Sequence, residues 1–104
     1  MLAIIAKYQF ASTEGTDQFC EHAKKIVAPS RAEDGCTIYS FARDIEDDKV
    51  VWISEEWESQ EALTAHLKQA FIAEFLANIA DIEIVAGESR QYEVSSVGPV
   101  VMPE

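Results

Sequence analysis

The chain is poor in cysteine, histidine and basic residues, and it has no long hydrophobic run. It contains two cysteines, two histidines and eight lysines and arginines against 19 acidic residues, for a formal net charge of −11 over 104 residues. This charge repels nucleic acid and anionic membrane surfaces, so we expect neither as a partner. No apolar stretch approaches the roughly 18 residues that a membrane-spanning helix needs.

The few cysteines also exclude several kinds of site. Cys20 and Cys36 form no CxxC pair and have no histidine tract nearby, which argues against a zinc ribbon or a redox dithiol. We expect both to be small core residues with reduced thiols, and we expect no metal. Residues 1–7 lack the basic opening and the cleavage site of a signal peptide, so a cytoplasmic location is the simplest expectation.

The densest acidic cluster is Asp44-Ile45-Glu46-Asp47-Asp48. Calcium or magnesium binding needs oxygens that converge at a defined spacing, and this run does not provide it. We interpret the cluster as the solvated connection of a hairpin.

What the chain does contain is typical of a folded domain. Hydrophobic residues make up 48% and charged residues 26%, and the length is that of one domain. We place that domain at residues 1–94. The remaining residues 95–104 include Gly98-Pro99 and Pro103, and we expect them to form an irregular or loosely docked tail.

Hydrophobic periodicity predicts the order of the elements. Apolar and aromatic runs predict strands, helical spacing predicts helices, and Ser59 is a candidate N-cap for the second helical region. Pro29 lies late in the first helix, where it favours a distorted or early end. The expected segments are strands 2–10, 36–43 and 50–57, a helix from about 16 to 31, a helical region from 59 to 79 with a small break near Ala70, and extended pieces at 82–85 and 88–94.

This β-α-β-β-α-β order predicts an α+β, ferredoxin-like fold with a four-stranded antiparallel sheet and helices on one face. Both faces of the predicted strands carry apolar residues: Val51 and Ile53 alternate with Val50 and Trp52. Because two helices cover only one face, the other needs a second protein surface. We therefore expect a homodimer with the two sheets packed face to face.

The most informative stretch runs from Glu55 to His66, where an apolar strand leads through a carboxylate and a tryptophan into a capped helix. Together with Gly35-Cys36-x-x-Tyr39, the pattern Glu55-x-Trp57-Glu58-Ser59-x-Glu61-Ala62-Leu63-x-x-His66 resembles the antibiotic biosynthesis monooxygenase domain of the dimeric α/β-barrel superfamily. The resemblance covers residues 2–92. It implies oxidation of a small quinol or hydroxyaromatic compound by oxygen without a cofactor.

Such chemistry needs a base, an apolar chamber and orientation. His66 is the candidate base because imidazole titrates near neutral pH. Trp57, Tyr39, Glu55 and Phe71 are the candidate substrate-binding residues. Each has a structural alternative: Trp57 as core packing, Glu55 as a paired buried carboxylate, and Tyr39 as a dimer contact.

Two departures from the family pattern bear on the function. Members often carry a second histidine five residues after the first, and Phe71 occupies that position here. Haem-degrading relatives carry an asparagine on the first strand, where this chain has Tyr8, so we do not expect haem degradation. Two other functions stay open: isomerase or lyase chemistry that uses His66 and Glu55, and non-catalytic binding of a small molecule by a dimer.

Overall fold

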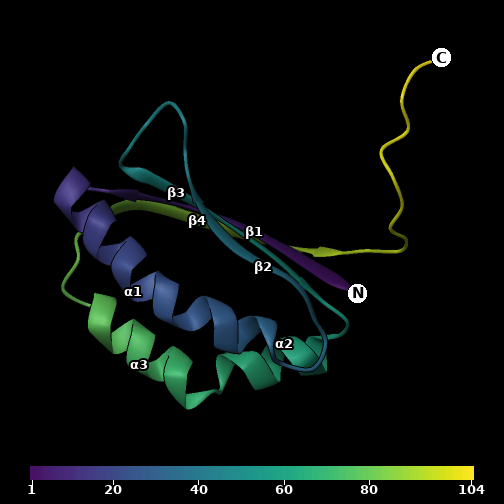
Figure 1. Cartoon of the computed structure of the whole chain (residues 1–104), viewed down its shortest axis with the longest axis horizontal. Coiled ribbons are helices and arrows are strands. Elements are labelled where there is room, and N and C mark those ends of the chain that lie inside the picture. Colours follow the sequence, from purple (N-terminus) through teal and green to yellow (C-terminus); the bar gives the residue numbers. More distant parts are fainter.

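The computed structural model describes residues 1–104 and contains four strands and three helices. Figure 1 shows the helices on one side of a twisted sheet and the other side of the sheet uncovered. In chain order the elements are β1 (Leu2–Phe10), α1 (Thr13–Arg31), β2 (Cys36–Arg43), β3 (Val50–Trp57), α2 (Gln60–Leu67), α3 (Ala70–Ile79) and β4 (Ile84–Glu93).

All strand pairs are antiparallel and the strand order is β2-β3-β1-β4. The ferredoxin-like arrangement expected from the sequence is confirmed, with the second helical region divided into α2 and α3. β1 lies in the centre, so its backbone is paired on both sides, while β2 and β4 form the two edges.

Strand register decides which side chains meet the helices. Leu2 lies opposite Trp57, and Tyr39 lies opposite Glu55, so these residues share the helix-covered face. Trp57 and Val51 are fully buried there. The buried hydrophobic core is Leu2, Ala6, Phe10, Phe19, Ala23, Ile26, Tyr39, Val51, Ile53, Trp57, Leu63, Ile72 and Phe75.

The start of α1 differs from the expectation, which had placed it near Thr16. The helix begins at Thr13 because the Oγ atom of Ser12 accepts a hydrogen bond from the backbone N–H of Gly15, 3.0 Å away. Pro29 does not stop the helix, which continues to Arg31. A proline removes one backbone donor and crowds the preceding turn, and this last turn tolerates that loss.

The second helical region behaves largely as expected. Ser59 caps α2 by accepting a hydrogen bond from the N–H of Ala62, and the break falls at residues 68–69, just before Ala70. β4 is one continuous strand rather than two pieces, with a register irregularity where Gln9 and Phe10 pair with it. Gly87 does not interrupt β4, because it pairs with Tyr8 of the central strand β1.

Gly35 fixes the turn between α1 and β2. Its φ of +84° lies in the left-handed region, where side chains are disfavoured. A Cβ atom at this position would lie 2.7 Å from the Cβ of Ala62, and the carbonyl of Gly35 accepts a hydrogen bond from the N–H of Glu58. The turn therefore sits tightly against the start of α2.

The uncovered face of the sheet keeps apolar side chains in solvent. Ile5, Ile38 and Tyr92 are between 41% and 45% exposed, and every residue of β4 is exposed. Residues 94–104 have no regular structure and extend away from the sheet (Figure 1), with Val94 bonded to the carbonyl of Met1. None of the three helices has the length and hydrophobicity needed to cross a bilayer.

Candidate active site

The predicted site residues meet in one aromatic cluster between β2, β3 and the helices. The ring of His66 lies 4.6 Å from the ring of Trp57 and 5.2 Å from the ring of Tyr39, measured between centroids. Phe71 closes another side at 6.3 Å. His66 is only 2% exposed, so its imidazole is packed among three aromatic rings.

Glu33 is the closest polar partner of His66. Its Oε2 atom lies 2.6 Å from the Nδ1 atom of the imidazole, and both side chains are largely buried. Glu33 comes from the turn that follows α1, and the N–H of Cys36 bonds to its carbonyl. A carboxylate accepts the proton of Nδ1 and thereby orients the ring.

Glu55 lies on the same sheet face and bonds to Trp57. The indole Nε1–H donates to Oε1 of Glu55 at 2.9 Å. Burial raises the pKa of the Glu55 carboxyl, while the bond from Trp57 and the nearby His66 act in the opposite direction. A carboxyl whose ionised form is disfavoured is suited to exchanging a proton.

Tyr39 is buried in the cluster, and its backbone is bonded to Arg31. Burial raises the pKa of its hydroxyl well above the usual range, and the negative charge of Glu55 adds to this effect. The Nε atom of Arg31 donates to the backbone carbonyl of Tyr39 at 2.9 Å. Because its phenol stays protonated, Tyr39 is available as a hydrogen-bond donor.

The structure brings all five predicted residues together, and it adds two that the sequence did not indicate. These are Arg31, the last residue of α1, and Glu33, in the turn that follows it. Glu33 and His66 are 33 positions apart, and no local pattern signals a contact over that separation. His22, on α1, is half-buried with its Nδ1 atom enclosed.

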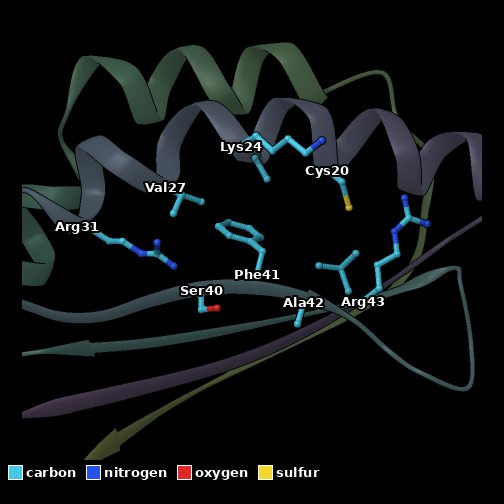
Figure 2. Close-up of a pocket in the computed structure, with 10 residues that line it drawn as sticks. Cys20, Lys24, Val27, Arg31, Ser40, Phe41, Ala42 and Arg43 are labelled. Carbon is cyan, nitrogen blue, oxygen red and sulfur yellow. The ribbon is translucent and has the colours of Figure 1, made fainter.

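A separate cavity of about 300 Å³ lies between α1 and β2 (Figure 2). The wall does not include His66. The wall consists of apolar side chains, three cationic ones and a serine. The residues that line it are Cys20, Ala23, Lys24, Val27, Arg31, Ser40, Phe41, Ala42, Arg43 and Val51.

No three histidine, cysteine, aspartate or glutamate side chains converge as a metal-binding group would. The cluster instead offers an imidazole with one nitrogen held by a carboxylate, a buried carboxyl and a phenol, all within an apolar surrounding. These groups are able to accept, hold and donate protons.

Comparison with known proteins agrees with this architecture. The sequence model of the family described as antibiotic biosynthesis monooxygenase matches residues 1–80. An uncharacterised protein of Synechocystis sp., sll1783, is 28% identical over 79 residues, which are 76% of this chain and 54% of that protein. The chain thus spans about half the length of this curated relative.

Solved structures share the whole fold. A protein from Deinococcus radiodurans, named as a candidate antibiotic biosynthesis monooxygenase, superimposes with a TM-score of 0.86 at 20% identity, over 98% of this chain and all of that one. A Bacteroides thetaiotaomicron protein of unknown function, named as a possible oxidoreductase, gives 0.79 at 25% identity, over 89% and 96% of the two chains. With the family model matching most of its length, the chain belongs to the antibiotic biosynthesis monooxygenase family.

Proposed function

We propose that this protein oxidises a small hydroxyaromatic compound with molecular oxygen, without a metal or organic cofactor, and that His66 is the base. The observation that carries the proposal is the 2.6 Å contact between Nδ1 of His66 and Glu33. When the carboxylate accepts the Nδ1 proton, the neutral ring keeps its lone pair on Nε2. That nitrogen then takes the proton of a substrate hydroxyl.

The reaction balances without an added reductant. A deprotonated phenol is electron-rich enough to pass one electron to oxygen, and the radical pair combines at the ring carbon opposite the hydroxyl. The resulting hydroperoxide loses water. One oxygen atom ends as the quinone carbonyl and the other leaves as water.

Neighbouring side chains supply the apolar surroundings and the orientation. Trp57 and Tyr39 form aromatic walls, and the protonated Tyr39 hydroxyl donates to a substrate oxygen. Phe71 is half-buried and follows the break between α2 and α3, where Gln69 provides no side-chain cap. We place substrate entry there, because the half-buried Phe71 ring lies next to the His66 ring, with 6.3 Å between centroids.

A homodimer is part of the proposal. The uncovered sheet face presents Ile5, Ile38 and Tyr92 to solvent. A second copy packed on that face removes this apolar surface from water and leaves the helix-covered site intact. The domain at residues 1–94 provides both surfaces, and residues 95–104 are the tail.

Oxygen uptake tests the assignment of the base. Purified protein is supplied with dihydroxynaphthalenes and anthrones, and the spontaneous oxidation without protein is subtracted. His66→Asn keeps an amide donor for Glu33 but has no basic nitrogen, so uptake should fall at least about 100-fold. His22→Asn removes the only other histidine and should leave the rate unchanged. Equal rates in wild type and His66→Asn would remove His66 from the mechanism.

A second candidate function is favoured by Glu55, whose pKa burial raises. With His66 it forms an acid–base pair that removes a proton from one carbon of a small metabolite. An isomerase returns the proton to another carbon, and a lyase gives it to the departing group. Turnover of substrate in the absence of oxygen distinguishes this reaction from the first.

A further inference from the structure

We propose that the cavity between α1 and β2 is a binding site for a small organic acid with an apolar, aromatic-sized body. This site is separate from the His66 cluster, and the proposal does not depend on the oxidation proposed above. It rests on the chemistry of the cavity wall, shown in Figure 2.

The wall has a charge opposite to that of the whole chain. Acidic residues outnumber basic ones by 19 to 8 in the sequence, yet Lys24, Arg31 and Arg43 line the cavity and no acidic residue does. Three cations line this one cavity in a strongly negative protein, and the carboxylates that pair with Lys24 and Arg43 lie outside its wall. An anion is therefore the ligand that this wall favours.

Arg31 is the best placed of the three cations. Its Nε atom is fixed by the carbonyl of Tyr39, and its two terminal nitrogens have no protein acceptor. In Figure 2 its guanidinium points along the cavity toward Phe41. A guanidinium held at one nitrogen is pre-oriented to bind a carboxylate with the others.

Lys24 and Arg43 form ion pairs at the surface. Lys24 pairs with Glu21, and Arg43 pairs with Asp17. The carboxylates are 71% and 61% exposed, and exposed pairs of this kind contribute only about 0–1 kcal/mol. Arg43 also donates from Nη1 to the backbone carbonyl of Asp48, so Lys24 is the cation that turns toward a ligand at the smaller cost.

The remaining wall is apolar and sets the size of the ligand. Figure 2 shows Phe41 rising from β2 toward α1, with Val27 on one side and Cys20 on the other. Val51, fully buried, is part of the wall. A volume of about 300 Å³ is at the small end of ligand sites and suits a compound of one or two rings.

The test uses the full chain and 2-naphthoate, with neutral 2-naphthamide as a ligand of the same shape. Calorimetry measures affinity, and mass spectrometry measures the rate at which iodoacetamide modifies each cysteine. Cys20 lines the cavity, and Cys36 does not. We expect naphthoate to slow modification of Cys20 at least threefold and to leave Cys36 unchanged, while the amide at equal concentration protects neither.

Variants distinguish an effect of the cavity wall from an effect of the protein's net charge. Arg31→Gln should weaken naphthoate binding about tenfold, and Lys24→Gln should weaken it less but in the same direction, with circular dichroism confirming the fold. Lys25→Gln makes the same charge change at an exposed position of α1, outside the cavity, and should have no effect. Equal loss in Lys25→Gln and Arg31→Gln would overturn the proposal.

Two further results would also overturn it. Equal protection of Cys20 by naphthoate and naphthamide would show that the cations do not favour the negatively charged ligand. Equal protection by inorganic phosphate would show that the apolar wall contributes nothing. Loss of oxidation in His66→Asn leaves naphthoate binding intact under this proposal, so the two proposals fail separately.

Discussion

His66 on α2 and Glu33 in the turn after α1 form one buried contact, with 2.6 Å between Nδ1 and Oε2. The contact connects two elements that are far apart in the sequence. It also gives the candidate base a fixed orientation in a cluster of aromatic rings. Structure and proposed chemistry therefore depend on the same pair of atoms.

Removal of the Glu33 carboxylate should weaken the fold. Glu33→Ala leaves the buried Nδ1 of His66 without its acceptor, and an unpaired buried donor costs about 1–3 kcal/mol. Urea unfolding measures the difference. Glu74→Ala, at an exposed position of α3, serves as the control and should change stability by less than about 0.5 kcal/mol. Equal stability of the two variants would mean that the contact is energetically neutral.

The turn that carries Glu33 should be equally sensitive at Gly35. Gly35→Ala places a Cβ at positive φ and only 2.7 Å from the Cβ of Ala62. The backbone strain alone is about 1–2 kcal/mol, and the contact with α2 adds to it. Gly98→Ala is the matched control because a Cβ there meets nothing within 4 Å. Thermal unfolding should separate the two variants, and coincident melting curves would contradict this account of the turn.

The elements were predictable because each has a local signal, such as the strand alternation of Val51 and Ile53 or the cap at Ser59. Local signals also located His66 and Trp57 near one another. Glu33 was not predictable, since its role depends on how the turn at Gly35 docks on α2. The cationic wall was not predictable for the same reason, because Lys24 and Arg43 line one cavity only after α1 packs over β2.

Glu55 should make stability depend on pH in the acid range. Burial raises its pKa above 4.5, so the folded chain holds this proton more tightly than the unfolded chain. Stability is then lost as pH rises from about 4.5 through the raised pKa. Glu55→Gln keeps an acceptor for Trp57 and carries no charge. Its stability relative to wild type should therefore increase with pH over this range.

Urea unfolding of both proteins between pH 4 and pH 7, at constant ionic strength, provides the measurement. Glu74→Gln removes one exposed carboxyl and corrects for the change in net charge. A constant difference between wild type and Glu55→Gln at all pH values would show that burial does not disfavour the Glu55 carboxylate.

The proposed dimer should depend on the uncovered sheet face. Sedimentation equilibrium of the wild type should give twice the chain mass of 11.6 kDa. Ile5→Glu places a charge in the centre of that face and should yield the monomer, since an unpaired charge is costly to bury. Leu67→Glu makes the same change on α2, where the side chain is 60% exposed, and should leave the dimer intact. A monomeric wild type, or dissociation by Leu67→Glu alone, would place the interface elsewhere or exclude it.

Tyr39 should limit stability at alkaline pH. Burial and the charge of Glu55 raise the pKa of its hydroxyl above the ordinary value of 10. Above pH 10 the unfolded chain releases this proton and the folded chain keeps it, so stability falls as pH rises. Tyr39→Phe removes the titrating group but keeps the ring against His66. Its stability relative to wild type should stay constant from pH 7 to 9 and rise above pH 10. Urea unfolding measures the difference in stability between the two proteins. If that difference does not change between pH 9 and pH values above 10, Tyr39 ionises as readily in the folded chain as in the unfolded one.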